Sequence, residues 1–585
     1  MLITREQGVL RLKAKAYTLT FAPDRPFVQV HDTHGVQLAE LFMLSSVHPL
    51  NGRDDTTAIG SWEPTETSDE IVVSLCAASS TWQSKTYRLR CRPHCFQYEI
   101  EVQGTGALAE VNYFGGYYSG QVRWGSGFFW SGQQFKQGFN PEPNTEEINH
   151  FAPAGGAAID LMGVPLPGKG GWFFTPPPFC FAFESAHGWV GLGVEAQAGA
   201  KRFTEFCYHG RPDGFHLSLS FEGHTAVAGA YELPAIGFYF GHDELSVLSA
   251  HVQALARVDI APQQPARDKP DWWFEPIFCG WGAQCQLAAR ANGTAPDHAR
   301  QADYERFLDT LGQNGINPGT VTIDDKWQTT YGDNAVDENK WPDLSGFIAH
   351  QHAAGRRILL WLKLWDSEGL PADECITNAR GLPLSVDPSN PKFESRLRAQ
   401  VRRMLGSASY NADGFKIDFS ARIPSGPGIR TFGDSWGLEL MKRYLGIIYD
   451  EAKRAKPDAL VITHTAHPYL ADVVDMIRLN DLNRGTDIAR AMKHRARIAA
   501  IACPDALIDT DNWPMTDKAT WRAYTQLQPE LGVPSLYYTS HIDSTGEALD
   551  AGDYELIREV WARYRAVRRI NREQDLGKLT LANVG

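Results

Sequence analysis

The sequence predicts an α/β protein in which an N-terminal antiparallel β-sandwich domain precedes a (β/α)8 TIM barrel. Short segments of alternating polarity fill residues 1–265, and from residue 274 onward apolar runs alternate with segments of helical periodicity. A stretch with three prolines, 261–270, lies at the junction. We therefore expect a sandwich domain at 1–265 and a catalytic barrel domain at 266–585, joined by a linker.

The N-terminal part is expected to form antiparallel strands with one solvent-facing side, because Val, Thr, Tyr and Phe recur at every second position. The clearest strands are 16–21, 27–31, 70–77, 84–91 and 96–102. The first amphipathic helix falls at 243–254. A loop rich in Gly and aromatic residues, 113–139, contains Trp124 and either packs on its own sandwich or reaches over a neighbouring site.

Eight apolar runs supply the strands of the barrel. They are 277–281, 319–325, 357–363, 414–418, 460–464, 476–481, 506–509 and 535–541. The helices expected around them are 299–311, 344–354, 391–405, 435–455, 487–500, 518–531 and 554–567, with only a short one at 468–474. Eight such units match a closed barrel. The alternative, an open doubly wound sheet, normally carries a Gly-rich phosphate turn after its first strand, and this sequence has none.

The composition is that of a globular protein and argues against several partners. Of 585 residues, 21% are charged and 43% are hydrophobic. The net charge of -13 and the lack of Lys/Arg-rich runs make nucleic acid and anionic membranes poor partners. No apolar run reaches the length of a membrane span and the N-terminus lacks a signal-peptide core, so we expect a cytoplasmic protein. A homo-oligomer is compatible with these features.

The nine cysteines do not form a metal-binding pattern. Cys91 and Cys95 are the closest pair, and no second pair exists to complete a zinc site. We therefore expect reduced, mostly buried thiols, and neither a metal nor another cofactor.

Polar and aromatic side chains follow almost every predicted barrel strand. Because the active sites of such barrels lie at the C-terminal strand ends, we expect these side chains to converge there. The candidates are Trp281, Asp324, Asp325, Trp327, Trp361, Lys363, Lys416, Asp418, His464, Arg478, Asp481, Asp511 and His541. Asp509 and Asp543 also fall at strand ends, where we expect them to cap helices or stabilise loops.

Two of these carboxylates fit glycoside hydrolysis. Asp418 and Asp481 follow strands four and six, so both face the same rim. One would attack the anomeric carbon, and the other would protonate the leaving oxygen and then activate water. Lys416 lies on the same side of its strand as Asp418 and is expected to keep that carboxylate ionised. The 17 tryptophans are compatible with a sugar-binding cleft, because sugar rings stack on aromatic rings.

Three segments resemble glycoside hydrolase family 36, the α-galactosidases and raffinose-synthase-like enzymes. Ile323-Asp324-Asp325-Lys326-Trp327-Gln328 resembles its Ile-Asp-Asp-Gly-Trp-Gln segment, and residues 413–418, Asp-Gly-Phe-Lys-Ile-Asp, resemble its nucleophile strand. Asn480-Asp481 is at the place of its acid/base motif. The resemblance implies that Asp418 is the nucleophile and Asp481 the acid/base. It also implies that Asp324, Asp325 and Lys416 bind the sugar, and that the activity is that of a retaining exo-α-glycosidase, α-galactosidase-like.

Other residues are similar to glycoside hydrolase family 31. Phe415–Phe419 followed by Arg422-Ile423-Pro424 resembles the nucleophile region of its α-xylosidases, and Trp341-Pro342-Asp343 resembles a segment after its second strand. The glutamate that often follows the nucleophile in that family is replaced here by Ala421. The alternative is therefore a family 31-like α-glucosidase, α-xylosidase or sulfoquinovosidase. Both families usually add a β-domain after the barrel, and we expect none here because the chain ends shortly after Val567.

Two rival interpretations remain. In a metal-dependent barrel hydrolase, His464, His467, Asp481 and His541 would converge on a metal, but their spacing does not match the usual ligand patterns. A non-catalytic carbohydrate-binding barrel would keep the tryptophans and the Asp324-Asp325 pair, but it would not need both Asp418 and Asp481. In either of the sugar-related cases we expect a small oligosaccharide or α-glycoside as the ligand.

Overall fold

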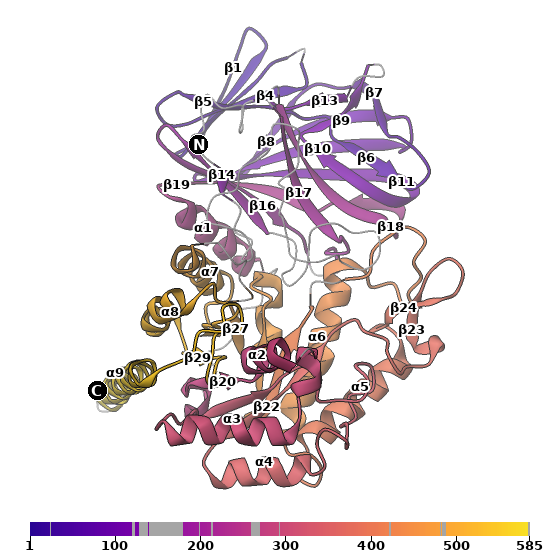
Figure 1. The fold of residues 1–585 in the computed structure, drawn as a ribbon. Helices are drawn as coiled ribbons and strands as arrows, with labels where there is room; N and C mark the ends of the chain where they lie inside the picture. The colour runs from indigo at the N-terminus through magenta and orange to yellow at the C-terminus, as the bar shows by residue number, and fades with distance from the viewer. Residues whose placement is uncertain are drawn as a thin grey trace.

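The computed structural model describes residues 1–23, 25–119, 123–127, 138–139, 179–197, 199–211, 214–258, 269–291, 293–420, 423–479, 481 and 487–582. Antiparallel sheets occupy the N-terminal part and a parallel barrel the C-terminal part, as Figure 1 shows. Most of the predicted linker at 261–270, much of the aromatic loop at 113–139, and Asn480, Ala421 and Arg422 lie outside the described residues.

Two sheets make up the N-terminal part. The first contains, in order, β1 (Leu2–Glu6), β2 (Val9–Lys13), β3 (Thr18–Phe21), β4 (Phe27–His31) and β5 (Gln37–Phe42). The second, of 14 strands, contains β6 (Ser46–Pro49), β7 (Asp55–Ile59), β8 (Glu63–Glu66), β9 (Ile71–Ser79), β10 (Ser84–Cys91), β11 (Cys95–Tyr113), β12 (Gly115–Tyr118), β13 (Arg123–Gly125), β14 (Gly138–Phe139), β15 (Cys180–Ser185), β16 (Gly188–Glu195), β17 (Glu205–Arg211), β18 (Gly214–Glu232) and β19 (Ala235–Gly241). The long β11 pairs with both β10 and β18, and along β10 buried side chains alternate with partly exposed ones.

Helix α1 (Glu244–Arg257) closes the N-terminal part. Asp243 caps it, since its carboxylate accepts a hydrogen bond from the N–H of Ser246. The helix confirms the first amphipathic helix predicted from the sequence.

Eight parallel strands form a nearly closed barrel. Around it they run β28 (Leu507–Asp509), β27 (Met476–Arg478), β26 (Leu460–Thr463), β25 (Gly414–Asp418), β22 (Arg357–Lys363), β21 (Thr320–Ile323), β20 (Ile277–Cys279) and β29 (Ser535–Leu536). A parallel bridge between Asp509 and Val533 connects β28, the first strand of this order, to the segment just before β29, the last. In it the N–H of Val533 donates to the carbonyl of Ile508 at 2.7 Å. Each strand thus pairs with its sequence neighbours, as the eight βα units predicted.

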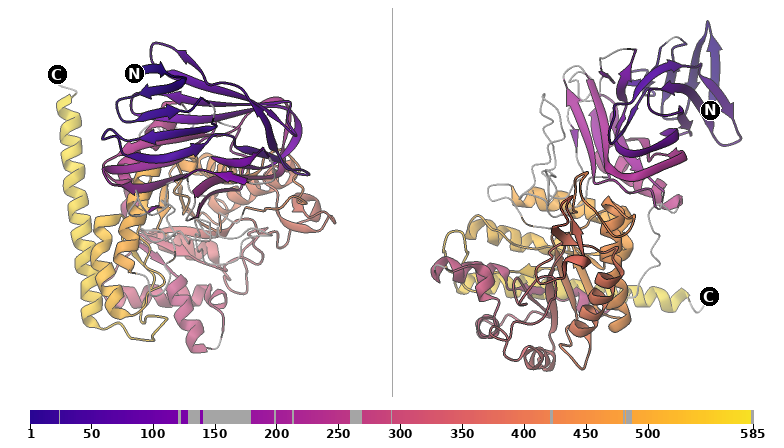
Figure 2. Two further views of the ribbon diagram at one scale, coloured as in Figure 1. Left: turned by 90° about the horizontal axis from the view of Figure 1, so that it is seen from above. Right: turned by 90° about the vertical axis from the view of Figure 1, so that its right-hand side faces the viewer.

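Helices and short insertions connect the barrel strands. The α-helices are α2 (Trp281–Ala291), α3 (Gln301–Gln313), α4 (Leu344–Ala353), α5 (Pro391–Leu405), α6 (Gly437–Ala455), α7 (Ile488–Ala502), α8 (Lys518–Leu531) and α9 (Ala551–Ala582). The 3-10 turns are η1 (Asp271–Phe274), η2 (Ala295–His298), η3 (Ala372–Glu374) and η4 (Pro468–Val473), and β23 (Cys375–Thr377) pairs with β24 (Pro383–Val386) in a hairpin. In Figure 2, α9 runs along the side of the molecule and ends away from its body.

The structure corrects two details of the predicted barrel and confirms a third. Helix α2 was not predicted, and it places Trp281 at the start of a helix and not at the end of strand one. The 3-10 turn η4 follows β26 and confirms the short helix predicted at 468–474, since the connection leaves no room for a longer one. Strand eight is only two residues long, so His541 lies in the loop beyond it.

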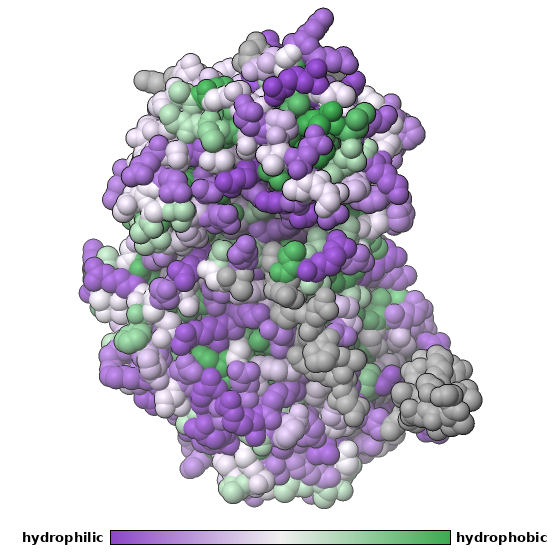
Figure 3. Space-filling model, turned by 180° about the vertical axis from the view of Figure 1, so that it is seen from behind, coloured by the Kyte–Doolittle hydropathy of each residue, from purple (hydrophilic) through white to green (hydrophobic). Residues whose placement is uncertain are grey.

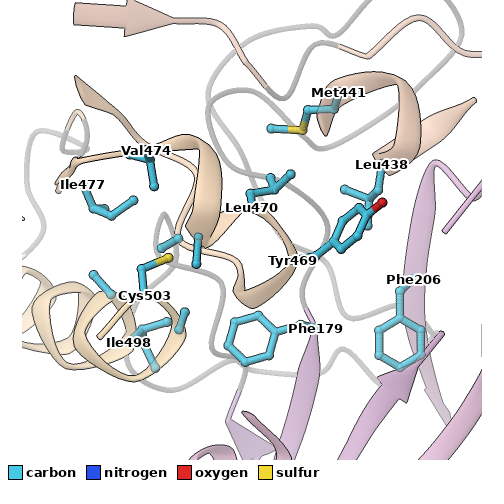
Figure 4. Close-up of a cluster of buried hydrophobic side chains, with 14 of the residues drawn as sticks. Phe179, Phe206, Leu438, Met441, Tyr469, Leu470, Val474, Ile477, Ile498 and Cys503 are labelled. Atoms are coloured by element: carbon cyan, nitrogen blue, oxygen red, sulfur yellow. The ribbon is translucent and has the colours of Figure 1, made fainter. Parts of the chain in front are cut away.

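The N-terminal sheets rest on the segments that follow β25 and β26, on the side of the C-terminal strand ends. The N–H groups of Leu438 and Glu439 donate to the carbonyls of Phe203 and Lys201, both at 3.2 Å. An apolar cluster fills the joint (Figure 4). Its labelled members are Phe179 and Phe206 beside the sheets, and Leu438, Met441, Tyr469, Leu470, Val474, Ile477, Ile498 and Cys503 in the barrel. The sheets therefore lie close to the rim where the candidate residues gather.

The surface is mainly hydrophilic. In Figure 3 apolar side chains form separate patches between charged and polar ones. Among the helices that the structure describes, none combines the length and the hydropathy that crossing a bilayer requires.

Candidate active site

Parallel pairing sets the positions of the candidate residues. β22 and β25 are in register so that Trp361 is opposite Lys416 and Lys363 is opposite Asp418. Because side chains alternate along a strand, Lys416 and Asp418 both project into the barrel, one layer apart. Gly414 begins β25 with a φ of 154° in close contact with Leu460, so no side chain separates β25 from β26 there.

Arg478 is the centre of the site. It ends β27 and is almost fully buried. Its Nη2 donates to Oδ1 of Asp418 at 2.6 Å, and its Nη1 donates to Oδ1 of Asp481 at 2.8 Å and to Oδ2 of Asp511 at 2.5 Å. One guanidinium therefore holds three carboxylates that come from the ends of β25, β27 and β28.

The two predicted catalytic carboxyl groups have opposite electrostatic environments. Burial alone would raise the pKa of Asp418, but nearby positive charges, first Arg478 and then Lys416, hold it below its ordinary range. Burial dominates at Asp481 and raises its pKa to about 6, since Arg478 offsets only part of the effect and Asp511 adds to it. Asp418 is thus ionised at pH values where Asp481 still holds a proton.

Asp418 has a second hydrogen-bond donor. The indole N–H of Trp361 donates to its Oδ2 at 2.7 Å, so each carboxylate oxygen accepts one hydrogen bond and keeps a further lone pair. The carbonyl of Trp361 in turn accepts from the indole N–H of Trp327 at 2.8 Å. His464, directly after β26, is buried and its charge also acts to lower the pKa of Asp418.

Lys416 pairs with Asp324, which corrects one prediction from the sequence. Its Nζ donates to Oδ2 of Asp324 at 2.7 Å and to the sulfur of Cys279 at 3.4 Å. Its long side chain crosses the barrel interior to β21 and leaves the direct contact with Asp418 to Arg478. Lys416 still favours ionised Asp418 through its charge, but more weakly than Arg478.

Asp325 and Lys363 belong to a second group on the rim. The hydroxyl of Tyr331 donates to Oδ1 of Asp325 at 2.8 Å, and burial raises the pKa of Asp325 to about 6. The ammonium of Lys363 lies 4.2 Å from the centre of the Tyr331 ring and 2.8 Å from Oδ2 of Asp366. Asp325 and Lys363 remain partly exposed and face the rim.

Two predicted substrate contacts are enclosed in the structure. Trp327 is 0% exposed, so its ring supports Trp361 from behind and presents no face to a sugar. Asp511 is also 0% exposed and contacts Arg478. The loop that begins with Asp324 turns the Trp327 ring inward, which strand-end position alone did not predict.

Two further candidates lie apart from the carboxylates. Trp281 packs edge-on against Trp513 with ring centres 5.8 Å apart, and the indole N–H of Trp513 donates to Oδ2 of Asp543 at 3.2 Å. His541 pairs with the hydroxyl of Ser540 at 3.0 Å. Within the described residues the structure does not bring either of them to Arg478. Asp543 stabilises a loop, as the sequence predicted.

Cys279, Tyr331 and Tyr537 were missed from the sequence. Cys279 ends β20 and its thiol donates to Oδ2 of Asp324 at 2.9 Å. Tyr537, directly after β29, lies with its ring centre 5.2 Å from the ammonium of Lys416. Cys279 ends a barrel strand and Tyr537 follows one, but the predicted strands end at 281 and 541, beyond both residues, so the strand-end rule did not select them. Tyr331 lies eight residues after the end of β21, where that rule does not apply.

The described residues contain no group of three or more His, Cys, Asp or Glu side chains arranged to hold a metal ion. His464 and His467 are both buried, and His467 stacks edge-on against Phe179 with ring centres 5.5 Å apart. His467 therefore belongs to the joint between sheets and barrel.

No family model and no curated protein matches this sequence. Solved structures do match the fold. A GH31 family sulfoquinovosidase from E. rectale matches with a TM-score of 0.60 at 12% identity, over 96% of this chain and 82% of that chain. The cycloalternan-forming enzyme from Listeria monocytogenes matches with a TM-score of 0.51 at 12% identity, over 96% and 54%. A GH31 dextranase from Flavobacterium johnsoniae matches with a TM-score of 0.51 at 10% identity, over 98% and 69%.

These likenesses concern the fold. This chain spans about half, 54%, of the length of the Listeria enzyme. Two of these three neighbours are family 31 enzymes, and none of the three is described as a family 36 enzyme.

Proposed function

We propose that this protein is a retaining α-glycosidase similar to those of glycoside hydrolase family 31, which removes a terminal α-linked sugar from a small oligosaccharide or glycoside. One observation carries the proposal: Arg478 holds Asp418 and Asp481 together, while their surroundings separate their pKa values. An ionised carboxylate beside a protonated carboxyl group is the pair that a double displacement needs.

In the first step the Asp418 carboxylate attacks the anomeric carbon. The bond between that carbon and the leaving oxygen breaks, and its electron pair takes the proton of Asp481. Trp361 keeps Oδ2 of Asp418 in place through its 2.7 Å hydrogen bond. The products are a glycosyl ester of Asp418 and an ionised Asp481.

In the second step the Asp481 carboxylate takes a proton from water. The water oxygen attacks the anomeric carbon, the ester bond breaks and Asp418 leaves as a carboxylate. Both residues return to their starting states. Two displacements at the same carbon retain its α-configuration.

For the sugar, the α-galactosidase-like interpretation from the sequence gives way to the family 31-like one. The structural neighbours include a dextranase, a cycloalternan-forming enzyme and a sulfoquinovosidase. We propose an α-glucoside, α-xyloside or α-sulfoquinovoside as the substrate. Asp324, Asp325, Lys363 and Lys416 are the groups proposed to bind the sugar hydroxyls.

The division of the chain completes the proposal. We propose a sandwich domain at 1–265 that rests on the barrel rim and a catalytic domain at 266–585, in a cytoplasmic protein. The joint at Phe203 and Leu438 supports a role of the sheets in shaping the rim.

A panel of nitrophenyl α-glycosides tests the activity and identifies the sugar. Asp418→Asn should reduce turnover of the best substrate to background with an unchanged melting temperature. Asp481→Asn should lower kcat/KM by about 10²- to 10⁴-fold for poor leaving groups and far less for dinitrophenol. Proton NMR should show the α-anomer as the first product. Full activity of Asp418→Asn, or β-anomer first, would contradict the proposal.

The same panel separates the non-catalytic alternative. A carbohydrate-binding barrel would bind the sugars without turning any over, and Asp418→Asn would bind them equally well. Asp373→Asn, an exposed carboxylate paired with Lys392, is the control and should keep the activity of the parent protein.

A further inference from the structure

Asp511 shares one nitrogen of Arg478 with the proposed acid/base. Its Oδ2 accepts from Nη1 at 2.5 Å, and Oδ1 of Asp481 accepts from the same Nη1 at 2.8 Å. Nη2 donates to Oδ1 of Asp418 at 2.6 Å. The two hydrogens of Nη1 are therefore divided between Asp481 and Asp511.

The chain around Asp511 fixes the carboxylate in this place. Its φ of 49° lies in the left-handed region, which is uncommon for a residue with a side chain. Its N–H donates to Oδ1 of Asp509 at 3.0 Å, its Oδ1 accepts from the N–H of Trp513 at 2.9 Å, and its carbonyl accepts from Gln528 at 3.1 Å. Such a conformation persists where the surroundings hold it.

Asp511 has no route to a substrate of its own. It is 0% exposed, whereas the side chain of Asp481 is 17% exposed. Any effect of Asp511 on the chemistry must therefore pass through Arg478 or through its charge.

The charged and titratable groups that surround Asp481 and Asp511 come from several strands and from helices α7 and α8. They are Arg478, Asp418, Lys416, Asp509, Arg495, Tyr524 and Tyr537. Arg478 donates hydrogen bonds to both Asp481 and Asp511 and so links them.

We propose that Asp511 is a positioning residue. Because it accepts one of the two hydrogens of Arg478 Nη1, it limits how strongly Arg478 stabilises the ionised form of Asp481, and so keeps the acid/base protonated for the first step. The inference rests on the proposed function. Without the negative charge of Asp511, Nη1 would no longer be shared with a second carboxylate. The ionised form of Asp481 would then be stabilised by a stronger hydrogen bond and by the loss of a nearby negative charge. The proton would then leave Asp481 at a lower pH.

Asp511→Asn tests the proposal. Asn has the shape of Asp and still accepts from Trp513, but it carries no charge. The basic limb of the pH profile of kcat/KM should move to lower pH. At pH 6 the loss should be on the order of 10-fold for a poor leaving group, should shrink for dinitrophenol, and should be recovered by lowering the pH.

Asp475→Asn is the matched control. Asp475 is a buried carboxylate at the opposite end of β27, where it accepts from Lys453, Tyr449 and the N–H of Val461. Its removal should lower the melting temperature and leave the basic limb in place. A merely structural role of Asp511 would give that same result and would overturn the proposal.

The outcomes separate this proposal from the proposed function. A wild-type protein without turnover, or an active Asp418→Asn variant, would remove the glycosidase assignment. An active Asp511→Asn variant with an unmoved basic limb, or a loss equal for all leaving groups, would remove only the role of Asp511. If Asp511→Asn does not fold, Asp509→Ala removes the side-chain acceptor of the Asp511 N–H and should move the limb in the same direction. An unmoved limb in that variant overturns the proposal.

Discussion

Lys416 donates a hydrogen bond to Asp324 at 2.7 Å, while Asp418, two residues further along the same strand, takes its ion pair from Arg478 at 2.6 Å. The barrel interior thus contains two separate cation–carboxylate pairs in adjacent layers. The lower pair joins β25 to β21, and the upper pair joins β25 to β27. This division places the buried Asp418 carboxylate at the rim, with Lys416 and Asp324 paired in the layer beneath it.

The buried pair of Lys416 and Asp324 gives the first prediction. Lys416→Met removes the cation and leaves the Asp324 carboxylate buried and without its ion-pair partner, which should lower the free energy of unfolding by about 3–5 kcal/mol. The double variant with Asp324→Asn should recover a large part of this loss, because no unpaired charge remains. Urea denaturation of both single variants and the double variant measures the coupling. Strictly additive losses would contradict a direct ion pair.

The pH dependence of kcat/KM gives the second prediction. The proposed mechanism requires ionised Asp418 and protonated Asp481. Because the pKa of Asp418 lies below its ordinary range, activity should persist as the pH falls below 4, until the protein unfolds. As the pH rises, activity should fall with a midpoint near 6, the pKa of Asp481. A flat profile between pH 5 and 8 would exclude Asp481 as the acid.

The sequence was sufficient for much of the architecture. Strands 357–363 and 414–418 and helices 391–405 and 518–531 agree with the structure to the residue, because their apolar periodicity is unbroken and Pro, Asp or Gly marks their ends. Helix α2 was missed because a single residue, Gly280, separates it from β20 and its Gly, Ala and Gln residues give no clear apolar face. The short β29 was extended too far because apolar residues continue beyond the hydrogen-bonded pairs.

The sequence predicted which residues gather at the rim, but not which of them contact one another. Strand-end position placed Asp418, Asp481 and Arg478 on one rim, and the structure brings them together. Which cation meets which carboxylate depends on the barrel layers and on side-chain length, and the sequence does not show these. The inward turn of Trp327 depends on the path of a loop, which pattern alone does not give.

The indole of Trp361 gives the third prediction. Trp361→Phe keeps most of the ring but removes the hydrogen bond to Oδ2 of Asp418. A hydrogen bond to a charged group contributes about 1.5–3 kcal/mol, so kcat/KM should fall by roughly 10- to 150-fold. Trp327→Phe is the matched control: it removes the bond to the Trp361 carbonyl and should lower stability more than activity. Equal activity losses in the two variants would argue against a role of the indole N–H at the nucleophile.

The raised pKa of Asp481 gives the fourth prediction, which concerns stability. The carboxyl binds a proton more tightly in the folded protein than in the unfolded chain, so the stability present below its ordinary pKa of 3.8 is lost as the pH rises through about 6. Asp481→Asn lacks this titration. Relative to the wild type, the variant should gain up to about 3 kcal/mol between pH 4 and 7. Urea midpoints across this range measure it, and a gain independent of pH would contradict the shifted pKa.

Gly437, at the joint of sheets and barrel, gives the fifth prediction. It begins α6 with a φ of 56°, and a Cβ there would lie 2.1 Å from the carbonyl oxygen of Phe203. A side chain would therefore adopt a left-handed conformation and push Phe203 away, and we expect Gly437→Ala to lower the free energy of unfolding by at least about 2 kcal/mol. Gly446, in the middle of the same helix, is the control, since its Cβ would meet Val473 at an ordinary 3.9 Å. Gly446→Ala should raise stability by about 1 kcal/mol through helix propensity. The Phe203 carbonyl also accepts from the N–H of Leu438 next to the rim. Gly437→Ala should therefore lower kcat as well, whereas Gly446→Ala should not. Equal stability of the two variants would show that the sheets do not contact α6 closely at this point.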